Sequence, residues 1–133
     1  MRRYDYSRHE GDFHAEKIRI GGGRICYDLV SPLGNIADIE LGVPVSINID
    51  NSIAAIALAQ IAGADAESIR NAMASYSGVD RRFDFKIRTD ELVFLSDYAH
   101  HPEEIRQSIL SIREVFDGRR ITAISFPSHQ VHP

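Results

Sequence analysis

Short runs in which apolar and polar residues alternate occupy the first third of the chain. Residues 13–20, 25–30 and 36–41 follow the two-residue period of half-buried strands, so they predict three β-strands. The triple glycine at residues 21–23 predicts a hairpin between the first two, because glycine adopts positive φ at little cost. A phosphate-binding loop is disfavoured there, since no Gly-Lys-Ser/Thr follows and the next run is strand-like.

The pattern then changes to the period of an α-helix. Residues 52–62 are apolar or small nearly all round, which predicts a heavily buried helix. Asp50 or Asn51 is expected to cap its start and Gly63 to end it. Asp65 is expected to cap a second helix that ends at Ser77-Gly78, with one buried face formed by Ile69, Ala72, Met73 and Tyr76.

The last third of the chain favours strands again and then a helix. Residues 83–87 and 92–96 predict two strands joined by a turn at 89–91, and Pro102 suits the first position of the helix that follows. This helix is expected to stop at Gly118 and to bury Ile105, Ile109, Ile112 and Phe116. A strand at 121–124 would then complete a strand–helix–strand unit with a parallel, right-handed crossover. The fold class is therefore α/β.

Composition narrows the class of protein. A formal net charge of −4 gives no electrostatic reason to expect nucleic acid or an anionic membrane as a partner. The single cysteine, Cys26, excludes an internal disulfide framework and suits a reducing compartment. The chain has no secretory signal pattern at its start and no run apolar enough to span a bilayer, so a soluble cytoplasmic protein is expected.

Four polar positions precede or separate the predicted elements. Asn48 and Asn51 stand at the entry to the first helix, where they are either helix caps or amides that read an adenine edge. Arg81 and Arg82 lie at a predicted junction between domains. They are either solvated surface side chains or ligands of phosphate oxygens, which the planar guanidinium suits.

A second polar group follows the strand at 92–96. Asp97 is either a turn residue or a ligand of ribose hydroxyls, and Tyr98, His100 and His101 come directly after it. Adjacent histidines cannot easily point the same way, so one is expected to reach a ligand and the other to brace the loop. Asp97 and the two histidines are competent zinc ligands, but no matching spacing occurs elsewhere, and no metal site is predicted.

Two motifs, Arg81-Arg82-Phe83-Asp84-Phe85 and Asp97-Tyr98-Ala99-His100-His101-Pro102, resemble the ATP-dependent Mur ligases, specifically the UDP-N-acetylmuramate–L-alanine ligase family. The similarity extends from about Tyr4 to Ile124. The segment from Val45 to Asn51 is similar to the family's Gly-x-His-Asn-x-x-Asn, with Val45 and Ile47 in place of the glycine and histidine.

The resemblance implies a role for each of these residues. Asn48, Asn51, Arg82 and Asp97 would bind the nucleotide, with Arg82 facing the ATP phosphates as the catalytic residue of the set. Tyr98, His100 and His101 would lie near the amino-acid and muramoyl substrates. The cofactors implied for a whole enzyme are ATP and Mg²⁺, and its substrates are UDP-N-acetylmuramate and L-alanine.

The resemblance also implies a division of the chain. Residues 1–82 would be the C-terminal part of the central ATP-binding domain, and 83–124 the first β-β-α-β part of a Rossmann-like C-terminal domain. No Gly-x-x-Gly-Lys-Ser/Thr loop occurs in the 133 residues, so the isolated chain is predicted to be inactive. Residues 125–133 depart from the family, and we hypothesise a reading-frame shift near Ser125.

Two alternative functions and one question of assembly remain open at this stage. The chain could be part of a murein tripeptide ligase, which shares the acid–aromatic–Ala-His-His-Pro loop. It could instead be a nucleotide-binding or interaction module without catalysis. Because the helix at 52–62 is apolar nearly all round, exposed apolar surface could also make the chain a homo-oligomer.

Overall fold

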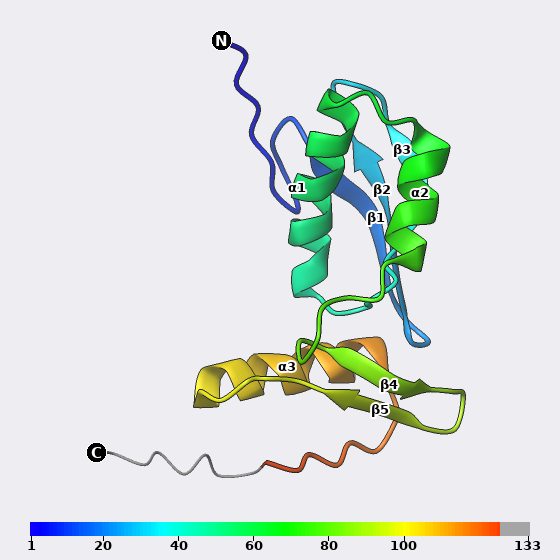
Figure 1. The fold of residues 1–133 in the computed structure, drawn as a ribbon, viewed down its shortest axis with the longest axis vertical. Coiled ribbons are helices and arrows are strands. Elements are labelled where there is room, and N and C mark those ends of the chain that lie inside the picture. Colours follow the sequence, from blue (N-terminus) through cyan, green and yellow to red (C-terminus); the bar gives the residue numbers. More distant parts are fainter. Residues whose placement is uncertain (126–133) are drawn as a thin grey trace.

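The first three strands form an antiparallel sheet, as the alternation predicts. The computed structural model describes residues 1–125. Strands β1 (His14–Gly21), β2 (Arg24–Val30) and β3 (Ile36–Glu40) are hydrogen-bonded in that order (Figure 1). The predicted glycine hairpin is confirmed: Gly21, Gly22 and Gly23 all have positive φ.

Helices α1 (Ile47–Ile61) and α2 (Ala66–Ser75) cover one face of this sheet. The helix predicted at 52–62 begins five residues earlier, so Asp50 and Asn51 are not its caps and lie inside it. Ile49 extends the buried stripe of the helix by a further turn, which explains the earlier start. Asp65 caps α2 as predicted, and its carboxylate accepts a hydrogen bond from the Ser68 backbone N–H at 2.7 Å.

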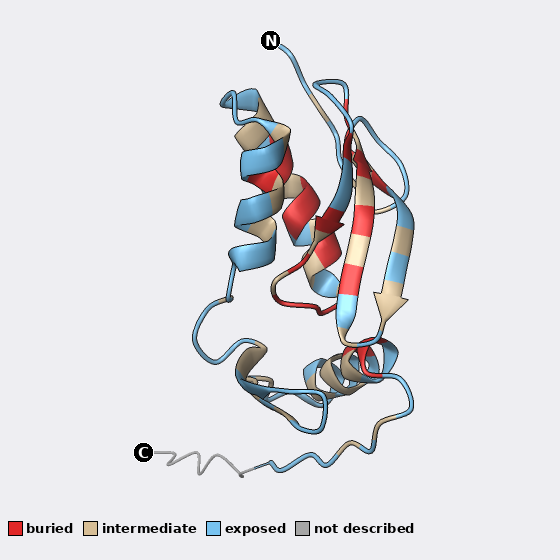
Figure 2. Cartoon of the chain, turned by 90° about the vertical axis from the view of Figure 1, so that its right-hand side faces the viewer, coloured by how far each residue is buried: buried red, intermediate tan, exposed pale blue. Residues whose placement is uncertain are grey.

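Two predictions of burial are wrong in part. The helix α1 buries one stripe only, and its Leu58 remains 70% exposed because the sheet and α2 cover a single side of it. In α2, Ile69 is buried and Met73 packs against the core, but Ala72 is exposed. Tyr76 lies beyond the helix end at Ser75 and is 51% exposed. Figure 2 shows the buried residues along the facing sides of the helices and the sheet.

The second sheet is the predicted hairpin of β4 (Asp84–Arg88) and β5 (Val93–Ser96), followed by α3 (Pro102–Val115). Pro102 occupies the first turn of α3 as expected. Of the predicted apolar stripe, Phe116 is buried just beyond the end of α3, whereas Ile105, Ile109 and Ile112 are only half-buried. The buried positions within α3 are Ser111 and Val115.

The strand predicted at 121–124 is not formed. Residues 121–125 have no strand structure, and Ile124 is 77% exposed. Both sheets of the described residues are antiparallel, so they contain no parallel crossover. A strand requires a partner for its backbone groups, and residues 121–124 pair with neither strand of the two-stranded sheet formed by β4 and β5. The segment 83–124 is therefore β-β-α rather than β-β-α-β. The hypothesis of a frame shift concerns a tail that lies almost wholly outside the described residues.

The end of α3 joins the two parts of the molecule. Val115 and Phe116 belong to the same hydrophobic core as the three-stranded sheet and α1. The backbone N–H of Gly23 donates to the Val115 carbonyl at 2.9 Å. The guanidinium of Arg88 donates to the carbonyls of Gly23 and Gly42 at 2.6 and 3.2 Å. No helix among residues 1–125 is both long and apolar enough to cross a membrane.

Candidate functional site

Asn48 and Asn51 lie in the first turns of α1. The amide of Asn48 donates to the Val43 carbonyl at 3.1 Å and accepts from the Asn51 amide at 3.4 Å. Asn48 is half-buried and thus fixed against the preceding loop, whereas Asn51 is exposed. The pair presents one constrained and one accessible carboxamide in the first turns of the helix, where the backbone N–H groups of Asn48 and Ile49 are already bound to the carbonyls of Val45 and Ser46 at 2.9 and 3.1 Å.

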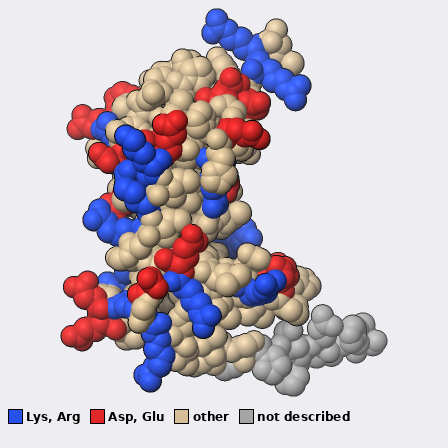
Figure 3. All heavy atoms as spheres, turned by 180° about the vertical axis from the view of Figure 1, so that it is seen from behind, with Lys and Arg blue, Asp and Glu red and all other residues tan. Residues whose placement is uncertain are grey.

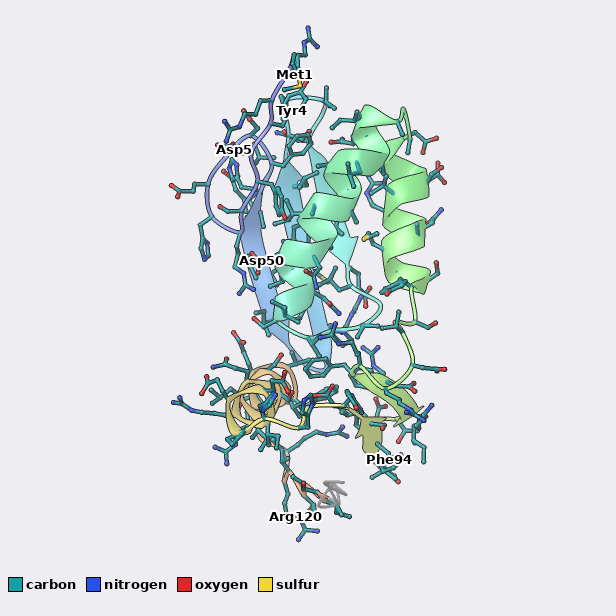
Figure 4. All side chains as sticks on the ribbon, turned by 60° about the vertical axis from the view of Figure 1, so that its left-hand side comes forward. Met1, Tyr4, Asp5, Asp50, Phe94 and Arg120 are labelled. Carbon is teal, nitrogen blue, oxygen red and sulfur yellow. The ribbon has the colours of Figure 1, made fainter. Side chains whose placement is uncertain are left out.

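A neighbouring segment fixes the start of the same helix. The Arg8 guanidinium binds the Asp50 carboxylate at 2.6 Å and also donates to the Ser46 carbonyl and hydroxyl at 2.7 and 3.1 Å. Figure 4 labels Asp50 on the side of α1 that faces the N-terminal segment. This interaction brings residues that are 42 positions apart into contact and holds the first turn of α1 in place.

Arg81 and Arg82 lie in a tight turn between α2 and β4. The backbone N–H of Arg82 donates to the Val79 carbonyl at 3.2 Å. Arg81 and Phe83 both have positive φ, at 63° and 45°, a conformation that is unfavourable for residues with a Cβ. The Arg82 side chain is exposed, so its guanidinium is accessible to an anionic ligand.

Asp97 and Tyr98 connect this turn to the end of β5. The backbone N–H of Tyr98 donates to the Arg81 carbonyl at 2.6 Å, so the two sequence motifs lie side by side. The Asp97 carboxylate accepts a hydrogen bond from the Ser108 hydroxyl of α3 at 2.6 Å. Ser108 was not predicted as a site residue. Its i+4 spacing from Glu104 on a helix was the one signal that sequence offered.

The three rings of Tyr98, His100 and His101 lie against one another. Their centroids are 5.3 Å apart for Tyr98 and His100, and 4.2 Å apart for the two histidines. The Nδ1 atom of His100 lies 3.1 Å from the Tyr98 carbonyl, while the Tyr98 ring is 64% exposed. The loop therefore presents an exposed aromatic surface whose middle ring is tied to the backbone.

Glu104 holds this loop from the first turn of α3. Its carboxylate accepts hydrogen bonds from the backbone N–H groups of His100 and His101, each at 3.1 Å. These bonds, first that from His100, lower the pKa of Glu104 below its ordinary value of 4.5. Glu104 was not predicted as a site residue, because its contact with the loop depends on how the chain folds back before α3.

Positive and negative side chains are interspersed over the face shown in Figure 3. Within residues 1–125, no group of three or more His, Cys, Asp or Glu side chains is arranged to hold a metal ion. Amide and guanidinium groups at Asn51 and Arg82 are accessible, and the described residues contain no metal-binding cluster of this kind.

Comparison with known proteins confirms the resemblance seen in the sequence. No protein-family model matches the chain. It is 64% identical over 124 residues to the UDP-N-acetylmuramate–L-alanine ligase of Phocaeicola vulgatus, which covers 93% of this chain and 27% of that protein. It is 49% identical over 128 residues to the corresponding ligase of Parabacteroides distasonis, covering 96% and 28% respectively.

Solved structures support the same assignment. The fold matches the crystal structure of UDP-N-acetylmuramate-alanine ligase from Thermotoga maritima with a TM-score of 0.70 and 28% identity, over 81% of this chain and 26% of that one. Folylpolyglutamate synthetase from Lactobacillus casei shares the fold at a TM-score of 0.64 and 23% identity. The α/β fold class is confirmed. The chain spans about a quarter of the length of the curated relatives that it matches.

Proposed function

We propose that this chain, which belongs to the Mur ligase family, is the part of a UDP-N-acetylmuramate–L-alanine ligase that spans the junction between its ATP-binding and C-terminal domains. The 64% identity over 93% of the chain carries the proposal. Residues 1–82 would be the end of the central domain and 83–124 the beginning of the C-terminal domain. The whole enzyme would use ATP to join L-alanine to UDP-N-acetylmuramate through an acyl phosphate, as a step in peptidoglycan synthesis.

Four residues would bind the nucleotide. Asn48 and Asn51 would read the adenine edge, because a carboxamide donates and accepts at the same time. The Asp97 carboxylate would accept hydrogen bonds from ribose hydroxyls, and the exposed Arg82 would contact the phosphates. Support for this grouping comes from the hydrogen bond between Tyr98 and Arg81, which brings the arginine turn beside Asp97.

Tyr98, His100 and His101 would contact the two substrates that the new amide bond joins. Their rings form an exposed surface beside Asp97, so they would lie next to the nucleotide rather than against its base. With His100 held by the Tyr98 carbonyl, His101 would be the histidine that reaches the ligand.

The chain supplies only part of what ATP chemistry requires. Magnesium would neutralise charge on the phosphates of bound ATP, yet residues 1–125 contain no cluster able to hold it. The residues present fit a nucleoside and one phosphate contact but not the metal. Arg82 would stabilise negative charge that develops on the transferred phosphoryl group, and the aromatic loop would hold the substrates close to it.

A chimera tests this proposal directly. Residues 4–124 of this chain would replace the matching segment of the Phocaeicola vulgatus ligase, and formation of the amide product would be measured. The chimera is expected to be active, and Arg82→Ala is expected to lower its kcat by about 100-fold or more. Arg113→Ala, which removes another exposed arginine, serves as the control. An inactive but folded chimera, or equal loss in both variants, would contradict the assignment.

The 133-residue chain itself is expected to release no phosphate from ATP in the presence of both substrates. Calorimetry with ATP distinguishes a non-catalytic binding module from a part of an enzyme. Micromolar binding that Asp97→Ala and Asn51→Ala both abolish would support the module. Supplying tripeptide in place of alanine to the chimera would separate the murein tripeptide ligase from the alanine-adding enzyme.

We also propose that the isolated chain self-associates through the uncovered side of α1. Leu58 and Ile61 are 70% and 55% exposed on this helix, and burying them in a contact between two copies would be favourable. Sedimentation analysis should show a dimer or larger species that Leu58→Glu dissociates. Leu33→Glu, at a turn between β2 and β3, is the control and should leave association unchanged.

A further inference from the structure

Three polar side chains share one face of α3. Glu104, Ser108 and Ser111 are four and three residues apart, a spacing that places side chains above one another along a helix. This face enters the protein towards the C-terminal end of the helix: Glu104 is exposed, Ser108 is half-buried, and Ser111 is only 8% exposed. Serine is a weaker helix former than alanine, so helix formation does not explain two serines at these positions.

Each of the three side chains binds a different segment outside α3. Glu104 accepts the backbone N–H groups of the histidine loop, and Ser108 donates to the Asp97 carboxylate. Ser111 accepts a hydrogen bond from the Ser46 backbone N–H at 2.8 Å. Ser46 directly precedes α1, where its hydroxyl and carbonyl are bound by Arg8. The third contact joins residues that are 65 positions apart.

These contacts constrain three of the segments that carry proposed ligand-binding side chains, while the turn with Arg82 is held through the Tyr98 N–H rather than by α3. A single rigid helix touches the loop with the two histidines, the strand end with Asp97 and the start of the helix with Asn48. Because the three anchors lie on one helix face, their separations are set by the helical rise and do not depend on loop conformation. Residues held in this way act by keeping other groups in productive geometry.

We propose that Glu104, Ser108 and Ser111 are positioning residues that use α3 as a common frame for the nucleotide-binding and substrate-binding segments. The inference rests on the proposed function, since the segments that they hold carry the proposed site residues. None of the three contacts the ligands. Their effect is to fix Asp97, the loop of the two histidines and the start of α1 relative to one another.

Nuclear magnetic resonance of the 133-residue chain tests the Glu104 anchor without any activity. In Glu104→Gln, the backbone amides of His100 and His101 are expected to exchange with solvent about tenfold faster, because a hydrogen bond to a charged acceptor is replaced by one to a neutral acceptor. Glu103→Gln is the matched control, because it removes the same charge from the residue that precedes Glu104. Among residues 1–125, the Glu103 carboxylate binds Gln107 and Arg106 and not the histidine loop.

A spectroscopic signature separates positioning from a general loss of stability. In the wild type, the His100 and His101 amide signals should shift together as the pH falls through the lowered pKa of Glu104. This shared titration should persist in Glu103→Gln and vanish in Glu104→Gln. Equal behaviour of the two variants, or a titration that survives in Glu104→Gln, would overturn the assignment of Glu104.

The two serines are tested by substitutions that remove or retain the hydroxyl. Ser111→Ala is expected to accelerate exchange of the Ser46 amide and leave the Asp97 carboxyl signal unchanged. Ser108→Ala should do the reverse, and Ser108→Thr should restore the wild-type Asp97 signal. If Ser108→Ala and Ser111→Ala perturb the same nuclei equally, the anchors are not independent and the proposed frame is wrong.

Kinetics of the active chimera complete the test. Ser108→Ala is expected to raise KM for ATP about tenfold with little change in kcat, and Ser108→Thr is expected to restore KM. If the substitutions change the resonance signals of the 133-residue chain as expected but the chimera is inactive, the proposed frame stands and the proposed function is contradicted. An active chimera whose segments are undisturbed by all three substitutions would contradict the frame alone.

Discussion

Tyr27→Phe tests how α1 is attached to the sheet. Tyr27 is fully buried, and its phenolic oxygen lies 2.6 Å from the Ser52 hydroxyl of α1. Ser52 donates its own proton to the Ile49 carbonyl at 2.8 Å, so the phenol must donate to Ser52. A phenolate could not donate this bond, and its charge would be buried in the core.

The size of the expected change in the free energy of unfolding follows from the raised pKa of Tyr27 in the folded protein. Burial raises the pKa of Tyr27 from 10.0 to about 12. The native state therefore keeps the proton to higher pH than the unfolded state does. The contribution of the protonated Tyr27 phenol to the free energy of unfolding is complete below pH 10 and is lost as the pH rises towards 12. At about 1.4 kcal/mol per pKa unit, the free energy of unfolding should fall by roughly 1.4 kcal/mol at pH 11 and by at most about 2.7 kcal/mol.

Urea unfolding followed by circular dichroism measures both proteins at a series of pH values. At pH 7, Tyr27→Phe should be less stable than the wild type by about 1 kcal/mol, the net value of one hydrogen bond. This difference should vanish or reverse near pH 11, because phenylalanine has no proton to lose. Tyr76→Phe, a substitution outside the core, controls for the loss of one phenol. A difference between wild type and Tyr27→Phe that stays constant from pH 7 to pH 11 would refute the reasoning.

Three further predictions concern the joints of the fold. Gly42→Ala should lower the free energy of unfolding by about 3 kcal/mol or more, because a Cβ there would lie 2.2 Å from the Tyr76 backbone carbonyl oxygen at the end of α2. Gly22→Ala is the control: its added Cβ meets no described atom within 4 Å, and its cost in the same urea titration should be only about 1 kcal/mol. The hydrogen bonds from Glu104 that stabilise the histidine loop should be lost as the pH falls below 4.5 and through the lowered pKa of Glu104. The His100 and His101 amides should then be less protected from exchange, relative to the intrinsic rate at each pH, and Glu104→Gln should show this weaker protection at every pH. Arg8→Lys should destabilise the chain by about 1–2 kcal/mol in thermal unfolding, since lysine cannot bind the Asp50 carboxylate and the start of α1 together; a thermal midpoint equal to that of the wild type would contradict this role.

The candidate site was predictable as a set of residues but not as an arrangement. Arg82 stands out by residue type at the junction before a predicted strand, and Asp97 and the two histidines by their place after one, which is information local to the sequence. The contact between Tyr98 and Arg81 joins residues from different elements, and no periodicity reports such a pair. Glu104 and Ser108 were missed for the same reason, since their roles depend on what the helix faces.

The sequence by itself determined the order and type of nearly all the elements. Alternation set the strands, the glycine run set the first hairpin, and Pro102 set the start of α3, because these signals act over a few residues. The resemblance to Mur ligases also came from the sequence, through two short motifs.

Only the tertiary structure decided burial, helix boundaries and the fate of the last predicted strand. Ile49 lengthens α1 because a sheet lies beneath it, whereas Leu58 of the same helix stays exposed because no residue among 1–125 covers its side. Residues 121–124 have a strand-like sequence but form no strand, since a strand exists only when another backbone accepts and donates its hydrogen bonds. Local pattern fixes which conformation a segment favours, and contacts between distant segments decide whether that conformation is realised.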